Sequence, residues 1–451
     1  MPKPNPSGLS AALILALAAL PAGAGDAREL AARLRAETAI HAEAARATSS
    51  TPIDMSASVL IQNRYMADIR KNPSPFGDRL DTVGFSIPRA QLRLDANIAN
   101  EQLLARVMID FGNAESDRGR GRGPDSDPAG GGSPRLREAW AQYNFSGEQT
   151  GYYLKAGQFR SLILYEEAIA PEYQLAVERS VTNEFFAPGN TQGVALGFVG
   201  PDIAWEVSFN DGIDYLGNRQ TVDTAFDSPF EADFAVSSRV DWKLAGDWSR
   251  FEDFTSWRGE DVAARVGTGF HWQRQGDTNP GSLIPDFIVG VGDALDVTTI
   301  MWTVDASYEG DGWHAFVAYV GHRLEWEIDS PTVGTLILTQ HGIVAQAGIF
   351  FIDDVEVFAR YDGILIDSAL IEGFGASEDY YHFVTVGLNY FLTPRSHAAK
   401  FSFDLTTALS DSDVLDSGTT STVFFPDPGV TGLMGGSPEE WLMRAQFQFL
   451  F

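Results

Sequence analysis

The chain ends on WLMRAQFQFLF (residues 441–451), a stretch in which apolar and polar side chains alternate. Its odd positions are all apolar, from Trp441 to Phe451, whereas Arg444, Gln446 and Gln448 occupy even positions that only Leu442 and Leu450 interrupt. Because successive side chains of a strand point to opposite faces, this segment predicts a strand with one apolar face. Its length suits a tilted strand that crosses a bilayer. Alone, such a strand is more often half of a soluble sandwich.

The composition restricts the classes of protein that remain. The chain has 451 residues, 12% aromatic residues and 44 glycines, which suits a large β-protein. No continuous apolar run after residue 25 is long enough for a membrane-spanning helix. The net charge of -29 argues against a nucleic-acid partner. The absence of cysteine removes disulfides, thiol catalysis and cysteine-based metal sites.

The N-terminus has the pattern of an export signal. Lys3 precedes an apolar core from Leu9 to Leu20, and Ala22-Gly23-Ala24 provides small residues for cleavage. We therefore expect a signal peptide at 1–24 and a periplasmic extension at 25–54. Residues 26–47 of that extension have apolar residues at helical spacing, which allows either a short helix or a solvated segment. The remaining residues, 55–451, form the repeating part of the chain.

Alternation like that at the C-terminus recurs along residues 55–451. It is clear at 103–111, 203–209, 300–306 and 355–361, where one face is apolar and the other holds Arg, Asp or Glu. With weaker candidates near 57–65, 151–159, 191–199 and 313–322, we expect about sixteen strands. An even number is what a closed antiparallel barrel with both termini on one side requires.

The connections between these strands alternate in length. Short ones are expected near 97–102, 146–150, 200–202, 309–312, 351–353 and 392–398. Long ones are expected near 66–83, 113–136, 160–190, 211–233, 274–297, 323–341, 362–379 and 409–440. Short periplasmic turns that alternate with long outer loops are typical of transmembrane barrels. Only 245–261 does not fit, because it is too long for an ordinary periplasmic turn.

One of the long connections is unusual for an outer loop. The segment from Arg160 to Gly189 contains many apolar residues, including Leu162, Tyr165 and Phe185. Exposed loops rarely display so much apolar surface. We expect this third loop to fold into the barrel and narrow its lumen, which in a barrel of sixteen strands is wide enough to hold water. An external lid that packs on other loops is the alternative.

Several short motifs carry a family resemblance. They are GQFR (157–160), ERS (178–180), NEFFAPG (183–189), GIVAQAGIF (342–350), DVEVFARYDG (354–363) and VGLNYF (386–391). In this order and spacing they resemble the phosphate-selective porin O/P family, from about residue 84 to the C-terminus. The resemblance implies a 16-stranded, trimeric channel in the bacterial outer membrane, with an inward third loop and passive, anion-preferring diffusion. Arg179 lies within one of the matching motifs.

The polar strand faces predict a set of basic residues along the lumen. With Arg179, the candidates for pore-lining or constriction residues are Arg89, Arg93, Arg106, Lys155, Arg160, Arg239, Arg265, Arg360 and Arg444. Rings of Arg or Lys attract anions. Acidic residues such as Asp95, Glu206 and Asp241 share these faces, so for any single Arg an ion pair within the barrel wall is the favoured reading. We therefore predict an outer-membrane porin for small hydrophilic solutes, with anions such as phosphate as candidates and the charge preference open.

Two readings from other classes compete with a porin. A lipase-like barrel would need a Ser–His pair on its lipid-facing wall, for which His271, His382, Ser307 and Ser402 are available. A structural or adhesive barrel with a plugged lumen is the other alternative.

No cofactor, catalytic or metal motif emerges from the sequence. Asp411, Asp413 and Asp416 lack the spacing of a calcium loop, and the seven histidines form no HExxH. The expected partners are outer-membrane lipid, small solutes or ions, and two further copies of the chain in a homotrimer.

Overall fold

The computed structural model describes residues 53–69, 81–112, 134–147, 149–213, 232–275, 293–329, 335–369, 379–409 and 440–451. The expected signal peptide lies outside these residues, as does the extension apart from Ile53 and Asp54, which begin the first strand. Among the described residues, no helix has the length and apolar character needed to cross a membrane.

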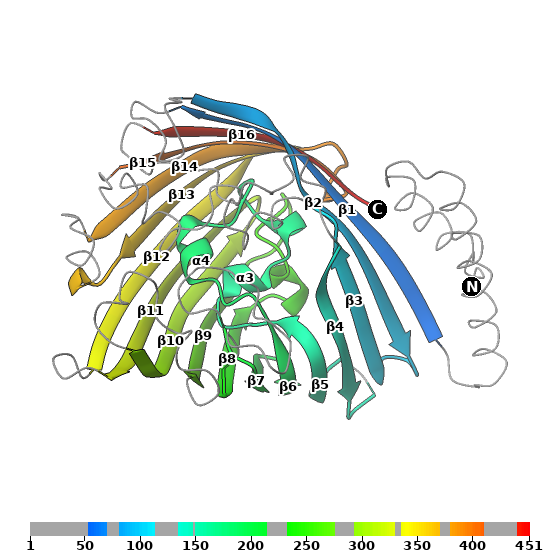
Figure 1. Cartoon of the computed structure of the whole chain (residues 1–451). Coiled ribbons are helices and arrows are strands. Elements are labelled where there is room, and N and C mark those ends of the chain that lie inside the picture. The colour runs from blue at the N-terminus through cyan, green and yellow to red at the C-terminus, as the bar shows by residue number, and fades with distance from the viewer. Residues whose placement is uncertain are drawn as a thin grey trace, which may run out of the picture.

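The described strands form one closed antiparallel barrel, which confirms the predicted fold class and strand number (Figure 1). Each strand pairs with its neighbours in the sequence, and β1 pairs with β16 to close the ring. Closure leaves no unpaired strand edge, as a membrane-spanning sheet requires. The strands are β1 (Ile53–Ile69), β2 (Asp81–Ile98), β3 (Leu103–Asp110), β4 (Arg135–Asn144), β5 (Gly151–Arg160), β6 (Asn190–Val199), β7 (Ile203–Asn210), β8 (Phe234–Ala245), β9 (Ala263–Gln275), β10 (Asp293–Gly310), β11 (Trp313–Asp329), β12 (Thr335–Ile352), β13 (Val355–Leu365), β14 (Tyr380–Phe391), β15 (Ala399–Ala408) and β16 (Trp441–Leu450).

The last strand has the two faces that its sequence predicts. The aromatic side chains of Trp441, Phe447 and Phe449 are exposed on the outside, whereas Arg444 and Gln448 are buried on the inside. Beyond the strand, Phe451 continues the pairing with β1, because its N–H donates to the carbonyl of Val59 (3.1 Å) and its carbonyl accepts from the Val59 N–H (2.7 Å). The C-terminal residue is therefore part of the seam that closes the barrel.

Deletion of Phe451 is expected to impair barrel closure. The shortened chain loses two backbone hydrogen bonds at the seam between β1 and β16 and one outward aromatic side chain. The yield of heat-modifiable, membrane-inserted protein should fall relative to Phe451→Tyr, which keeps the backbone pairing and an aromatic ring. Equal insertion of the two variants would contradict this role.

The strand limits differ from the prediction at two connections that we expected to be long. The predicted link 323–341 is occupied by the end of β11 and the start of β12, and the ends of 66–83 belong to β1 and β2. These strand ends carry charged residues such as Glu325 and Glu327. They interrupt the apolar pattern from which we set the strand limits, because strands that extend into water need no apolar face.

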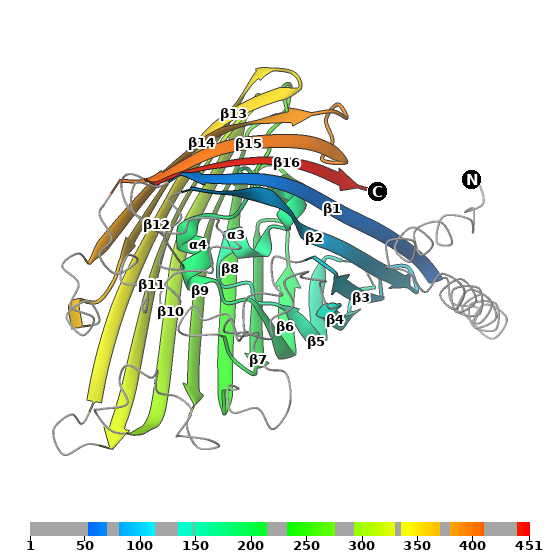
Figure 2. The same ribbon diagram turned by 45° about the horizontal axis from the view of Figure 1, so that its top comes forward.

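Short helices occur in two of the connections that the structure describes in full. The third loop (residues 161–189), between β5 and β6, contains α3 (Tyr165–Ala168), the 3₁₀ helix η1 (Pro171–Tyr173) and α4 (Val181–Phe186). The connection from β8 to β9 (residues 246–262) contains the 3₁₀ helix η2 (Trp248–Phe251). In both ribbon views α3 and α4 lie within the ring of strands (Figures 1 and 2).

Candidate functional site

The third loop contacts strands on many sides of the barrel. Arg239 of β8 donates to the carbonyl of Ile163 (3.0 Å), whereas Arg64 of β1 donates to that of Val177 (3.3 Å). Further hydrogen bonds join the loop to β2, β12, β13, β14, β15 and β16. Because β1 and β8 are far apart around a closed ring, a segment that reaches both must cross its interior. We infer from these contacts that the third loop lies inside the barrel.

The ten predicted basic residues all contribute to the inner wall or to the third loop, and each is ion-paired. Arg89 and Arg93 belong to β2, Arg106 to β3, Lys155 and Arg160 to β5, Arg179 to the third loop, Arg239 to β8, Arg265 to β9, Arg360 to β13 and Arg444 to β16. Each has a carboxylate within 4.0 Å. This pairing supports ion pairs within the barrel wall, and not a continuous row of unpaired basic residues along the lumen.

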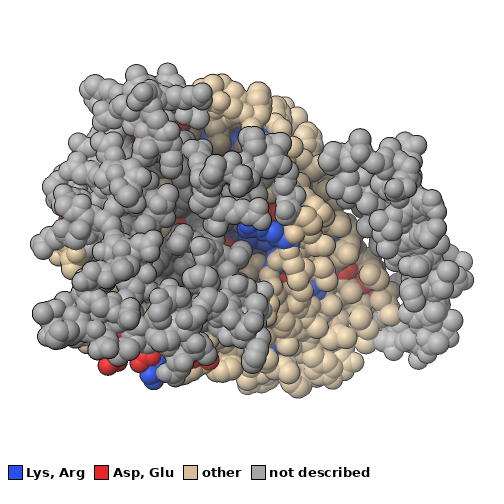
Figure 3. Space-filling model, viewed as in Figure 1, with Lys and Arg blue, Asp and Glu red and all other residues tan. Residues whose placement is uncertain are grey.

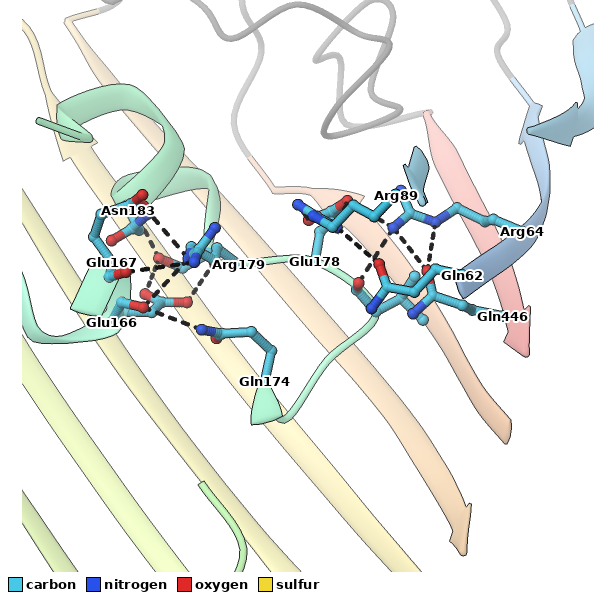
Figure 4. A network of polar contacts seen from close by, with 12 residues as sticks. Gln62, Arg64, Arg89, Glu166, Glu167, Gln174, Glu178, Arg179, Asn183 and Gln446 are labelled. Carbon is cyan, nitrogen blue, oxygen red and sulfur yellow. Dashed lines mark hydrogen bonds and ion pairs between the residues drawn. The ribbon is translucent and has the colours of Figure 1, made fainter. Parts of the chain in front are cut away.

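One group of ion pairs attaches the middle of the third loop to the wall (Figure 4). Glu178 of the loop accepts from Arg64 (2.6 Å) and, through both oxygens, from Arg89 (2.9 and 2.8 Å). All three side chains are buried. Burial alone would raise the pKa of Glu178, but the guanidinium groups of Arg89 and Arg64 outweigh it and hold this pKa well below the usual range. Glu178 therefore stays charged at neutral pH.

A β-bulge in β2 directs Arg89 toward this group. Opposite β1, Gln62 pairs with Arg89 while Arg64 pairs with Ser86, so β2 holds an extra residue at this point. Pro88 lies in the bulge, where its missing N–H costs no ladder hydrogen bond. Because of the extra residue, odd-numbered side chains point outward before the bulge and inward after it. Phe85 is accordingly exposed on the outside, whereas Arg89 is buried on the inside.

A second group of ion pairs connects β8, β9 and β10. The carboxylate of Asp305 accepts from Arg239 (2.8 Å) and Arg265 (2.7 Å), and Asp241 accepts from both as well (2.7 and 2.5 Å). The Arg265 guanidinium lies over the ring of Tyr165 in the third loop, 3.2 Å from its centroid. With a side chain only 1% exposed, Arg265 supports the loop instead of meeting solutes.

Other basic residues hold the loop backbone. Arg360 donates to the carbonyl of Glu178 (2.8 Å), and Arg179 to that of Ile169 within the loop (2.9 Å). Arg444 is paired with Asp404, whose other oxygen accepts from the N–H of Val177 (3.0 Å). Buried backbone groups need such partners, and here the charged wall provides them.

The least buried predicted residues lie on the β2–β5 side. The side chain of Arg106 is 31% exposed and that of Arg93 is 18% exposed. Arg106 pairs with Asp95 (2.6 Å) and lies 5.4 Å from the ring centroid of Trp140. Some inward residues of β2 and β4, among them Asn97 and Gln142, are half-buried. This side of the interior is therefore less tightly filled, and Figure 3 shows Lys and Arg atoms gathered near the centre of the face that it draws.

The basic residues of the inner face that were missing from the sequence-based set include Arg64 and Lys400. Arg64 lies in β1, which gave only a weak strand pattern, and Lys400 begins the polar face of β15. Lys400 donates to the carbonyls of Glu172 (3.3 Å) and Gln174 (3.1 Å) in the third loop. The alternation of Gln62, Arg64 and Asp68 along β1 is the signal that places Arg64 on the inner face.

Within the third loop, Glu166 is buried next to a helix start. Its carboxylate accepts from the N–H (2.6 Å) and hydroxyl (2.5 Å) of Ser180, the residue that caps α4. A guanidinium nitrogen of Arg360 lies 4.0 Å from this carboxylate. Burial raises the pKa of Glu166 to about 7, and the contacts from Arg360 and Ser180 only partly oppose this shift.

We expect the third loop to be held less firmly as the pH rises from about 4.5 to about 7. In that range Glu166 is protonated in the docked loop but ionised in a detached loop. Protonation therefore stabilises docking at the lower pH, and this contribution is lost as Glu166 ionises with rising pH. Hydrogen exchange of residues 166–180 should be slower at pH 5 than at pH 8. Glu166→Gln should reduce this difference, after correction for intrinsic exchange. An unchanged difference in the variant would assign the pH effect to other groups.

Neither a metal centre nor a lipid-facing Ser–His pair emerges from these residues. In the described ranges, no group of three or more His, Cys, Asp or Glu is placed to hold a metal ion, and Asp411, Asp413 and Asp416 lie outside those ranges. Ser307 and Ser402 are buried on the inner face, whereas His382 contacts the hydroxyl of Tyr361. His271 also points inward, where its Nδ1 lies 2.8 Å from the hydroxyl of Ser237.

Comparisons with known proteins identify the fold. No family model matches the chain, and no curated protein sequence matches it. OmpF of Salmonella typhi, solved with daunomycin, has a TM-score of 0.54 and 11% identity, over 88% of this chain and 97% of that one. The anion-selective porin from Comamonas acidovorans has a TM-score of 0.50 and 12% identity, over 89% and 100%. The trimer form of OmpT, an outer membrane protein of Vibrio cholerae, has a TM-score of 0.52 and 13% identity, over 89% and 100%. The chain therefore has the 16-stranded barrel fold of the outer-membrane porins.

Proposed function

We propose that this protein is a bacterial outer-membrane porin, through which small hydrophilic solutes diffuse passively. One observation carries the proposal: the closed barrel of sixteen strands is apolar outside and charged inside. An apolar outer band suits lipid, and a barrel of this strand number encloses water instead of being filled by its own wall side chains. The signal peptide expected at residues 1–24 supports the same location.

The third loop is the proposed constriction. Its contacts with β1, β8 and β12–β16 occupy much of the interior and leave the β2–β5 side less buried. Solutes would then pass along a wall on which Arg93, Arg106 and Asp95 are the accessible charges. Because each of these arginines faces a carboxylate, we propose a weak preference for anions, with phosphate among them.

Membership of the phosphate-selective porin O/P family and a homotrimeric assembly are further parts of this proposal. The motif order in the sequence supports the first. The second is supported by the same resemblance and by the trimer form of OmpT, which shares the fold.

Conductance in planar bilayers tests the proposal. Purified protein should form open, ohmic channels in KCl, and a KCl gradient should give a reversal potential of the sign for anion preference. Competition by phosphate should lower the chloride current. A cation-selective reversal potential would overturn the anion preference alone, whereas the absence of any conductance from inserted barrels would overturn the channel.

The extensive burial of the inner wall favours one second candidate, a plugged structural barrel. Single-channel recording separates a plug from a constriction, because a plugged barrel inserts without conducting. A lipase-like enzyme lacks comparable support, since the Ser237–His271 contact faces the interior and is buried.

A further inference from the structure

The connection from β8 to β9, residues 246–262, is much longer than the other described connections at the same end of the barrel. We call it the crossing turn, because its contacts lie on widely separated parts of the rim. Near its start, Trp248 donates to the carbonyl of Gly200 in the β6–β7 turn (2.8 Å). Near its end, the carbonyl of Arg258 accepts from Arg395 in the β14–β15 turn (2.8 Å). Eight strands separate those two turns around a ring of sixteen, so the crossing turn spans the mouth.

The crossing turn is fixed by buried contacts along its length. The ring of Trp257 packs against Phe350 and Phe391, with centroids 5.1 and 4.7 Å apart. Arg250 pairs with Glu309 at the end of β10 (2.8 Å), and Gly312 donates to the carbonyl of Trp257 (3.2 Å). Packed aromatic rings and paired charges of this kind indicate a fixed position across the mouth.

The crossing turn also meets the third loop. The hydroxyl of Tyr165 donates to the carbonyl of Phe251 (2.5 Å), and the N–H of Phe254 donates to the carbonyl of Tyr173 (3.2 Å). Tyr165, Phe251 and Phe254 share one apolar cluster with Phe316 and Phe358, which project inward from β11 and β13. The wall is apolar where these segments pack, so the crossing turn and the third loop form one continuous body.

We propose that the crossing turn is a second constriction element, which covers the mouth at the short-turn end and helps to set the size limit for solutes. This inference rests on the proposed channel function. It assigns a role to the one connection whose length the barrel pattern does not explain. Solutes that pass the third loop would leave between the crossing turn and the β2–β5 wall.

Shortening the crossing turn is the direct test. Replacement of residues 247–261 by a two-residue Asn-Gly turn should raise the single-channel KCl conductance about twofold, because the third loop and the crossing turn act as two resistances in series and one of them is removed. Larger sugars should also enter liposomes that contain the variant. Unchanged conductance and sugar exclusion in a heat-modifiable barrel would overturn the inference, whereas a non-conducting wild-type protein would overturn the channel function itself.

A cysteine variant provides a test that keeps the crossing turn intact. Because the chain has no cysteine, Glu252→Cys introduces a single thiol at an exposed position of this turn. Attachment of a bulky methanethiosulfonate should lower the current measurably, whereas the same label on Asp202→Cys, in the short β6–β7 turn, should not. If labelling of Glu252→Cys is complete by mass and the current is unchanged, the turn does not border the pathway.

Discussion

Glu178→Gln should release the middle of the third loop from the barrel wall. The substitution removes a buried charge with which both Arg64 and Arg89 are paired, and both guanidinium groups remain buried. Removing one partner of a buried ion pair typically costs about 3–5 kcal/mol, because the remaining charge has lost its compensation. We expect this loss to appear as local opening of the loop, since the backbone ladder of the barrel is unaffected.

Hydrogen exchange and single-channel recording measure this release. Exchange at residues 172–180 should accelerate strongly in Glu178→Gln, and the open-channel current should become noisier as the loop moves. Glu325→Gln is a matched control, because Glu325 is paired with Arg323 at a position where both side chains are over 40% exposed. Such exposed pairs contribute about 0–1 kcal/mol. If both variants leave loop exchange unchanged, Glu178 does not anchor the loop.

The barrel was predictable from the sequence because the alternation within each strand shows which side chains face outward and which face inward. Alternation in β16 places Arg444 inside and Phe447 outside without reference to any other part of the chain. Strand pairing in such a barrel then follows the order of the chain, so local patterns suffice for the topology. The bulge at Pro88 is an exception to this simple alternation, because one extra residue reverses which positions of β2 face inward.

The role of the basic residues was not predictable in the same way. Each arginine could be assigned to a face, but its partner comes from a distant segment, as when Arg64 meets Glu178. Two inner-face glycines carry a further signal. A Cβ at Gly269 on the inner face of β9 would collide with the carbonyl of Ile163, and one at Gly342 would lie 2.5 Å from the ring of Phe186. These glycines mark where the third loop approaches the wall, although the sequence does not say which segment approaches.

Tyr165→Ala should have the largest effect on how the third loop and the crossing turn hold each other. The Tyr165 ring packs against Phe254 and Phe316, with centroids 5.8 and 5.6 Å away, and lies under the Arg265 guanidinium. Truncation of a buried aromatic side chain costs about 3–5 kcal/mol. Tyr165→Phe keeps the ring and loses the hydrogen bond to Phe251, which is worth about 0.5–1.5 kcal/mol.

The comparison of these two variants separates packing from hydrogen bonding. In Tyr165→Ala, hydrogen exchange should accelerate both at 161–189 and at 246–262, because the ring belongs to the third loop and packs against the crossing turn. In Tyr165→Phe the acceleration should be small in both. Tyr152→Ala, which truncates an exposed ring on the outer face, should alter neither segment. Faster exchange in the third loop alone would show that the crossing turn is held by its contacts with the rim, and that the two segments do not form one body.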